Sequence, residues 1–113
     1  MMEKEFLKIP NGRSIHNITV DDIIYIKAKG AYAEIFLATG EKHTCAKNLS
    51  ALFQNLSGKK YFYRPHKSHV VNLTKIKQYR SWGSCGLLVM SCGTMIPVSK
   101  REKPGFLSAF KNC

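Results

Sequence analysis

The chain has 113 residues, and its 18 Lys and Arg against 7 Asp and Glu give a formal net charge of +11. This length fits one domain, and 44% hydrophobic residues suffice for one core, so the composition excludes wholesale disorder. No apolar run approaches the roughly 20 residues of a membrane helix, and the N-terminus carries no secretory signal. We therefore expect a single, strongly basic domain over residues 1–113, located in the cytoplasm.

The positive charge is unevenly distributed along the chain. No carboxylate side chain lies between Glu41 and Glu102, whereas 11 Lys and Arg residues fall in that stretch. Ion pairs are therefore not expected to account for these cations, and a field of one sign attracts polyanions, nucleic acid first. Anionic lipid and acidic protein are weaker alternatives, and a merely solvated surface would carry both signs interspersed.

Short strands dominate the predicted elements of the first 46 residues. Residues 6–9 alternate apolar and polar side chains, and an Asn11-Gly12 turn leads into a second strand at residues 13–18. The other elements predicted here are a turn or single helical turn at residues 20–22, an apolar strand at 23–26, a basic loop at 27–31, and strands at 32–37 and 42–46.

One amphipathic helix is predicted over residues 49–56. Asn48 can serve as its N-cap, because the side-chain oxygen accepts from unpaired first-turn amides, and Gly58 provides the stop. Apolar residues at helical spacing form one stripe, which predicts packing against a sheet: Leu49, Leu52, Phe53 and Leu56.

The second half of the chain is also predicted to be mostly strands. Its elements are a strand at residues 61–63, an irregular connection at 64–72, a hairpin of strands 76–81 and 87–90 with its tip at 82–86, a strand at 94–96, a turn at 99–103 and a short helix at 104–110. The whole pattern predicts a mostly β fold with one good helix and a short C-terminal one.

The segment from Arg64 to Asn72 concentrates groups that bind nucleic acid. Two cations, two imidazoles, a hydroxyl and an amide fall within it, and each can donate to a phosphate oxygen or a base edge. A loop offers such groups to a groove without the fixed spacing of a helix face. Alone, the segment also fits an ordinary polar connection.

Three ordered blocks resemble the LytTR DNA-binding domain, the output half of many bacterial response regulators. The pattern Phe62-x-Arg64-x-His66-x-Ser68-x-Val70-Val71-Asn72 strongly resembles the signature of that family. Asp22-Ile23-Ile24-Tyr25-Ile26 is similar to its early strand, and Ile96-Pro97-Val98-Ser99-Lys100 to its closing "I-P-V-S-R". The resemblance spans nearly the whole chain, and the amphipathic helix lies where the family has one.

The resemblance implies a fold and a function. The fold is an elongated arrangement of short β-strands and small sheets. The function is sequence-specific binding of double-stranded DNA in bacterial transcription regulation, downstream of a two-component system. Loops enter successive major grooves, with a further minor-groove contact between them, and no recognition helix is used. The implied DNA-binding residues lie in three regions: Lys27, Lys29 and Tyr32; Arg64, His66, Lys67 and Ser68; and Lys100 and Arg101.

Two positions depart from the family pattern. Lys100 stands where the family usually has Arg, which holds guanine bidentately whereas Lys is a point charge. Either Arg101 substitutes for it, or base reading is weaker there. Tyr32 stands where a more polar residue is expected, which suits packing against sugar or phosphate.

The resemblance also bears on partners. Promoter repeats of duplex DNA are the expected partner, and a homodimer on DNA is compatible with paired sites. An upstream phosphoacceptor receiver domain is expected if the chain belongs to a longer protein. No cofactor, metal or membrane is expected.

Some of these residues have a structural alternative. His66 can pin its loop to the backbone, and Ser68 can staple it. Asn72 is predicted to cap the following turn, because Asn readily bonds its own local backbone. Trp82 is either exposed and functional or packed in the core or in a dimer.

Two other classes of function fit the sequence less well. A single-stranded DNA or RNA-binding β-barrel is the alternative, since residues 61–63 form an aromatic cluster beside cations. Catalysis is not expected, because no nearby carboxylate in the sequence can orient His66 or His69 and no Ser or Cys lies in a nucleophile motif. A metal site is not expected either, because the cysteines lack ligand spacing and Pro65 argues against a helix that would align the two histidines.

Overall fold

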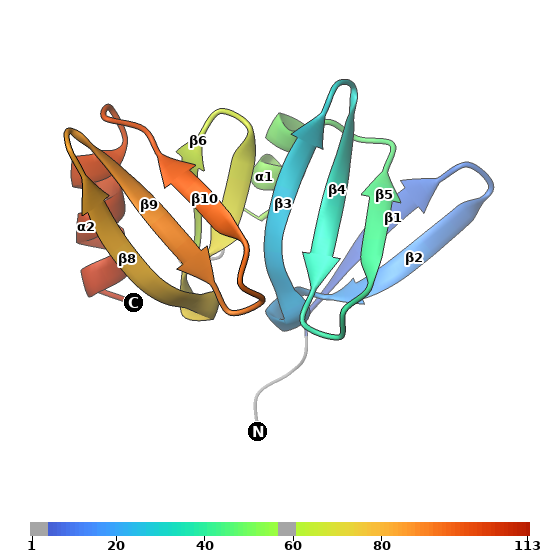
Figure 1. Cartoon of the computed structure of the whole chain (residues 1–113). Helices are drawn as coiled ribbons and strands as arrows, with labels where there is room; N and C mark the ends of the chain where they lie inside the picture. Colours follow the sequence, from blue (N-terminus) through green and yellow to red (C-terminus); the bar gives the residue numbers. More distant parts are fainter. Residues whose placement is uncertain (1–4, 57–60) are drawn as a thin grey trace.

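The computed structural model describes residues 5–56 and 61–113, and this part of the chain is mostly β-strand, as the sequence predicted (Figure 1). In chain order the elements are β1 (Phe6–Asn11), β2 (Ser14–Thr19), the 3₁₀ turn η1 (Val20–Asp22), β3 (Ile23–Lys29), β4 (Tyr32–Leu37), β5 (Lys42–Cys45), α1 (Leu49–Asn55), β6 (Phe62–His66), β7 (His69–Asn72), the 3₁₀ turn η2 (Leu73–Lys75), β8 (Ile76–Trp82), β9 (Cys85–Met90), β10 (Met95–Val98) and α2 (Lys103–Lys111). Gly58, the predicted helix stop, lies outside the described residues.

Three antiparallel sheets make up the described part of the fold. The central sheet has five strands in the order β5-β4-β3-β7-β6, a second has the order β10-β9-β8, and β1 and β2 form a separate hairpin. The molecule is flat and extended, with dimensions of 45 × 38 × 24 Å, which agrees with the predicted elongated arrangement.

The central sheet is buried on both faces. Val70 belongs to a hydrophobic cluster on one face with Ile26, and the adjacent Val71 belongs to a cluster on the other face with Tyr25. Successive side chains of a strand point to opposite faces, so a strand covered on both sides needs apolar residues at consecutive positions. This explains the continuous apolar run at the start of β3.

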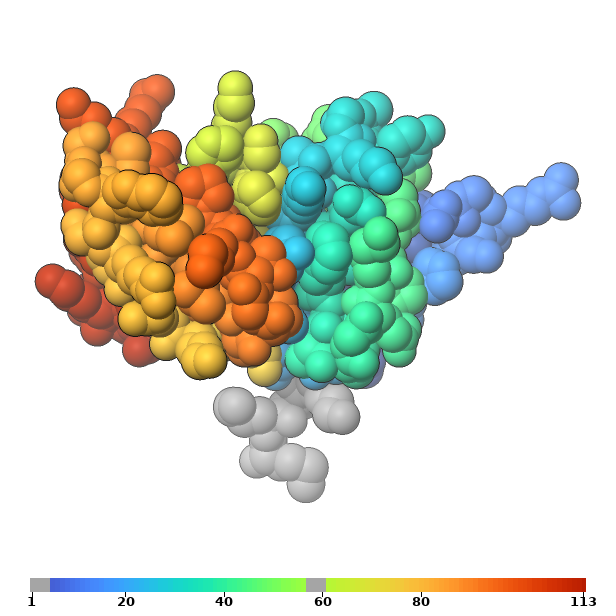
Figure 2. Space-filling view, viewed as in Figure 1, coloured from blue at the N-terminus to red at the C-terminus, as the bar shows by residue number. Residues whose placement is uncertain are grey.

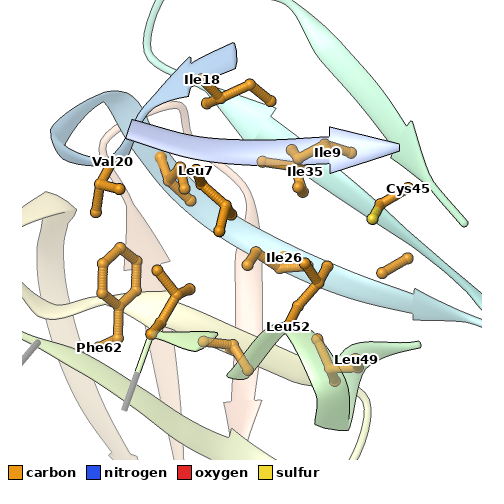
Figure 3. Packing of buried hydrophobic residues seen from close by; sticks show 14 of the residues in the cluster. Leu7, Ile9, Ile18, Val20, Ile26, Ile35, Cys45, Leu49, Leu52 and Phe62 are labelled. Atoms are coloured by element: carbon orange, nitrogen blue, oxygen red, sulfur yellow. The ribbon is translucent and has the colours of Figure 1, made fainter. Parts of the chain in front are cut away.

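Helix α1 and the β1–β2 hairpin cover the first face (Figure 3). The Asn48 side chain accepts a hydrogen bond of 2.9 Å from the Ala51 amide, which confirms the predicted N-cap. Leu49 and Leu52 are buried against Ile26 and Ile9 in the same cluster. The predicted apolar stripe therefore packs on the sheet.

Helix α2 and the β8–β9–β10 sheet cover the other face. Phe106 of α2 is fully buried, and its ring lies 5.8 Å from that of Tyr63 and 5.7 Å from that of Tyr79, centroid to centroid. These contacts join the helix to β6 and β8.

Two predictions of local structure are wrong. The expected basic loop at residues 27–31 is a hairpin whose β3 strand continues to Lys29, and only residues 30–31 form the turn, where Gly30 has a φ of 59°. The expected irregular connection from Arg64 to Asn72 is also a hairpin, β6–β7, with its turn at residues 67–68. Both become strands because they pair with β4 and β3, contacts that lie outside any local pattern.

Other boundaries moved by a few residues. The turn of the first hairpin is at residues 12–13, the β8–β9 turn is only residues 83–84, β10 runs to Val98 and α2 runs from Lys103 to Lys111. Pro97 fits in β10 because that strand is at the edge of its sheet.

Candidate nucleic-acid interface

Three turns that are distant in sequence lie along one edge of the molecule, the upper edge in Figure 1. They are residues 30–31 between β3 and β4, residues 67–68 between β6 and β7, and residues 99–102 between β10 and α2. Figure 2 shows these segments, cyan, yellow and orange, projecting from the same side with hollows between them. We call this side the basic edge, because exposed Lys67, Lys100 and Arg101 lie in these turns.

Backbone hydrogen bonds hold the three turns together. The Ala28 amide of β3 donates to the Ser68 carbonyl over 2.8 Å, and the Ser99 amide donates to the Pro65 carbonyl over 3.0 Å. The pairing of β6 with β7 shifts between Tyr63 and His66, which is a bulge at the position of Pro65. Because proline has no N–H for a ladder, a bulge on an edge strand accommodates it and leaves its carbonyl for Ser99.

Three of the predicted site residues shape the β6–β7 turn. The Arg64 guanidinium donates to the Ser50 hydroxyl over 2.9 Å and to the Lys67 carbonyl over 2.7 Å. The Ser68 amide donates to Nδ1 of His66 over 3.2 Å. The His66 ring therefore fixes the backbone of the turn, which is the structural role predicted as an alternative for this residue. These contacts leave the Lys67 side chain exposed at the tip.

A pocket of about 400 Å³ joins the β6–β7 turn to the β10–α2 connection. Its lining residues are Arg64, His66, Lys67, Ser99, Arg101 and Glu102. Glu102 accepts a hydrogen bond of 3.1 Å from the Tyr63 hydroxyl, and burial, followed by this carboxylate, raises the pKa of Tyr63. One carboxylate oxygen of Glu102 is thus bonded to Tyr63, and the described lining also carries the cations Arg64, Lys67 and Arg101.

Lys100 and Arg101 are exposed in the β10–α2 connection. Within residues 5–56 and 61–113, neither of them nor Lys67 makes an ion pair with a carboxylate. The Glu102 amide donates to the Ser99 hydroxyl over 3.2 Å, which orders the turn before α2. The three cations are therefore available to a polyanion.

The cations of the β3–β4–β5 region have a different environment. Glu34 of β4, whose side chain is only 10% exposed, lies 3.1 Å from Nζ of Lys42 and 3.9 Å from Nζ of Lys29. The hydrogen bond from Lys42, together with the charge of Lys29, lowers the pKa of Glu34 against the opposing effect of burial. The expectation that cations after Glu41 lack acidic partners is therefore wrong for Lys42. Tyr32 pairs with Lys29 across the turn and is 54% exposed.

His69 was not among the predicted contact residues, yet it lies between two of the regions. It pairs with Lys27 on β3 and with His66 on β6, and its ring centroid is 6.1 Å from that of His66. Burial, and then the charges of His66 and Lys27, lower the pKa of His69 to about 4. Its Nδ1 is buried without a hydrogen-bond partner in the described part of the chain. Only the strand register, which the sequence does not give, could have revealed this position.

The aromatic cluster at residues 61–63 is engaged with the rest of the protein, with Phe62 buried and Tyr61 and Tyr63 half-buried. Phe62 is 6% exposed, and the Tyr61 hydroxyl donates to Asp21 over 3.0 Å. Burial and the bond to Asp21 raise the pKa of Tyr61 to about 12. The sheets do not close into a barrel among the described residues, so the surface required by the single-strand alternative is not formed by these rings.

Two further residues have structural environments. Asn72 is fully buried, donates to the Ile23 carbonyl over 2.9 Å and accepts from the Thr74 amide over 3.0 Å, so it caps η2 as predicted. Cys45 is buried, and all four cysteines are free. Among residues 5–56 and 61–113 no cluster of three or more metal-ligating side chains is present.

Comparison with known proteins gives the family. The model of the LytTr DNA-binding domain matches residues 13–111, which include all nine site residues assigned from the resemblance. The chain belongs to the LytTR family. This is a DNA-binding family, and the fold, the signature hairpin and the closing strand agree with the assignment.

The LytTR relatives of this chain are bacterial regulators. It is 31% identical over 99 residues to the CO-responsive transcriptional regulator RcoM of Rhodospirillum rubrum, covering 84% of this chain and 41% of RcoM. It is 31% identical over 97 residues to the sensory transduction protein LytT of Oceanobacillus iheyensis, covering 83% of this chain and 39% of LytT. The chain thus spans about two-fifths of these relatives.

A solved structure has the same LytTR fold. A LytTr DNA-binding domain from Bacillus cereus superposes with a TM-score of 0.78, covering 95% of this chain and 97% of that one at 24% sequence identity. In the described part of the chain, no helix has the length and apolar character needed to cross a membrane.

Proposed function

We propose that this LytTR domain binds double-stranded DNA sequence-specifically, as the output domain of a bacterial transcriptional regulator, and that the basic edge is its DNA-binding surface. The observation that carries the proposal is that backbone hydrogen bonds tie three basic turns to one edge. Residues separated by as much as 74 positions, Lys27 to Arg101, are thereby presented together. A continuous positive surface is what a polyanionic duplex selects.

The order of the three turns along the basic edge suits contacts in successive major grooves, which recur about every 34 Å along B-DNA. Two-stranded β-ribbons fit the major groove, so the narrow β6–β7 and β3–β4 hairpins can enter it without a recognition helix. The β10–α2 connection then reaches the flanking groove or backbone.

The site residues divide into two roles. Lys67, Lys100 and Arg101 contact DNA directly, and Arg101 supplies the bidentate guanidinium that Lys100 cannot. Arg64 and His66 act chiefly by holding the β6–β7 turn in shape, because the Arg64 guanidinium donates to the Lys67 carbonyl and the His66 ring accepts from the Ser68 amide. Ser68 adds its hydroxyl to the direct contacts with DNA.

The β3–β4 hairpin has a positioning role in this proposal. Lys27, Lys29 and Tyr32 contact phosphate and sugar, because Lys29 shares the Glu34 carboxylate and Tyr32 presents an exposed ring. Contacts to phosphate and sugar fix the register of a protein on its duplex and carry no sequence information.

Selection of bound duplexes from random sequence tests the proposal. We expect one preferred sequence, and affinity for it that falls steeply with salt, with a log–log slope of about −0.9 per phosphate contacted. Lys67→Ala is expected to weaken binding, whereas Lys111→Ala, the same charge change at the far end of α2, leaves it nearly unchanged. Equal affinity for all duplexes, or a preference for single strands, contradicts the proposal.

The stoichiometry follows from the same selection. Two spaced half-sites would support a homodimer on promoter repeats, and analytical ultracentrifugation with the selected duplex measures the number of chains bound. In a full-length protein with an upstream phosphoacceptor domain, we expect that domain to control this pairing.

A further inference from the structure

Trp82, the only tryptophan in the chain, is held in solvent at the end of β8. Its side chain is 69% exposed, although tryptophan ordinarily buries most of its large ring. Core packing, one of the alternatives for this residue, is therefore wrong. An exposed aromatic ring on a short hairpin is well placed to contact a binding partner.

A tight turn and two hydrogen bonds hold the hairpin tip that carries Trp82. The β8–β9 turn has only two residues, and Gly83 adopts a φ of 57°, which suits a tight turn. Nζ of Lys103 donates to the Ser81 hydroxyl over 2.8 Å and to the Gly83 carbonyl over 3.4 Å. The tip is thus fastened to the first residue of α2, two positions after Arg101.

This tip belongs to the same side of the molecule as the basic edge. Figure 1 shows the β8–β9 turn beside the β10–α2 connection on the upper edge, and the two bonds from Lys103 confirm that they are neighbours. Residues 80–85 contain no acid, and Arg80 is exposed next to the turn. The charge around Trp82 therefore favours a polyanion over a second copy of this +11 chain.

We propose that Trp82 is an additional DNA contact, whose ring packs on a deoxyribose of the duplex backbone while its indole N–H donates to a phosphate oxygen. The inference rests on the proposed function, because the β10–α2 connection must approach the duplex for the ring to reach it. The indole provides an apolar face and one donor, which match the sugar and the phosphate respectively. Trp82 thereby lengthens the footprint beyond the three basic turns.

Intrinsic fluorescence tests this directly, because Trp82 is the only indole in the chain. The selected duplex carries a dye far from the site, so its anisotropy reports binding independently of the tryptophan. We expect the Trp82 emission to be quenched or shifted in step with the anisotropy. Trp82→Ala is expected to weaken duplex affinity about fivefold without changing the salt slope, since it removes no charge.

Ile15→Ala is the matched control, because Ile15 is 70% exposed on β2, in the separate hairpin. It is expected to leave duplex affinity unchanged, and circular dichroism of both variants checks that they fold. Trp82→Phe is expected to retain most of the affinity.

Three results overturn the inference. If the Trp82 emission is unchanged at saturating duplex, Trp82 does not contact DNA, and the proposed function is unaffected. Absence of duplex binding by the anisotropy signal removes the proposed function and this inference with it. An emission shift that follows protein concentration without DNA assigns Trp82 to contacts between copies of the chain instead.

Discussion

The two ends of the basic edge carry similar charge in the sequence but differ in what that charge contacts. At the β3–β4 end, Lys29 lies 3.9 Å from the carboxylate of Glu34, which also lies 3.1 Å from Lys42 at the start of β5, away from the edge. At the β6–β7 and β10–α2 end, the exposed side chains of Lys67, Lys100 and Arg101 pair with no carboxylate in the described part of the chain. The number of basic residues in the sequence therefore overestimates the positive charge that is available to DNA.

The physical reason is the strand register. Glu34 stands opposite Lys27 in the β3–β4 ladder, and β5 brings Lys42 to its other side. A carboxylate placed among three cations neutralises part of their field before any DNA arrives. The other end of the edge consists of turns whose acid, Glu102, is bonded to Tyr63.

The largest expected effect is at the unpaired end. Lys67→Ala and Arg101→Ala are each expected to cost about 1–3 kcal/mol of duplex binding if they contact bases, with relaxed specificity at the contacted position. Lys29→Ala, the same kind of change at the paired end, is expected to cost less than about 1 kcal/mol. Fluorescence anisotropy at fixed salt measures all three, and a larger loss from Lys29→Ala contradicts the comparison.

The next effect concerns the shape of the unpaired end. Arg64→Lys keeps the charge but cannot reach the Ser50 hydroxyl and the Lys67 carbonyl with one planar fork. We expect a loss of about 1 kcal/mol in the free energy of unfolding and a loss of duplex affinity. Urea denaturation and anisotropy measure the two losses, with Arg13→Lys in the exposed β1–β2 turn as the control. Unchanged affinity would show that the turn keeps its shape without Arg64.

The sequence predicted correctly those elements that depend on interactions between residues close together in the chain. The N-cap Asn48 and the stripe containing Leu52 identified α1 correctly, because capping and helical spacing depend on residues one turn apart. The family signature around Lys67 identified the family correctly, but it did not predict a hairpin, and DNA contact by this segment stays a prediction. Residues 64–72 were predicted to be an irregular connection, and pairing with β7 makes a strand of the part that contains Pro65.

The features of the site that the sequence did not predict depend on contacts between residues that are distant in the chain. The Glu34 ion pairs join residues on three strands, and no spacing in the sequence gives their register. The position of Trp82 beside α2 likewise depends on Lys103, 21 residues further along the chain. The sequence therefore shows which residues are basic, and the fold decides which of them are free.

A smaller effect is expected from pH at the junction of the two ends. The pKa of His69 is lowered from 6.5 to about 4, chiefly by burial, so the folded protein disfavours its protonation. Stability is then full above pH 6.5 and falls as the pH decreases toward 4, because the unfolded chain takes up the proton first. For a half-exposed ring we expect a loss of about 1 kcal/mol between pH 7 and 5. Urea denaturation at both pH values measures it, and His69→Gln should abolish that part of the pH dependence whereas His16→Gln should not.

The smallest expected effect has the opposite sign, and it separates the two ends of the edge most sharply. Glu34→Gln removes the carboxylate that pairs with Lys29 and Lys42, so Lys29 on the basic edge becomes available and one source of repulsion for phosphate disappears. We expect duplex affinity to rise about twofold to fivefold and the salt slope to steepen by up to about 0.9 for each phosphate newly contacted. Glu41→Gln is the matched control, because Glu41 lies in the β4–β5 turn at the lower side of Figure 1, away from the basic edge. If only Glu34→Gln raises the duplex affinity, the β3–β4 end faces the duplex and the Glu34 carboxylate weakens its positive field. Equal gains from both substitutions would reduce the effect to net charge, and no gain would place this end of the edge outside the DNA-binding surface.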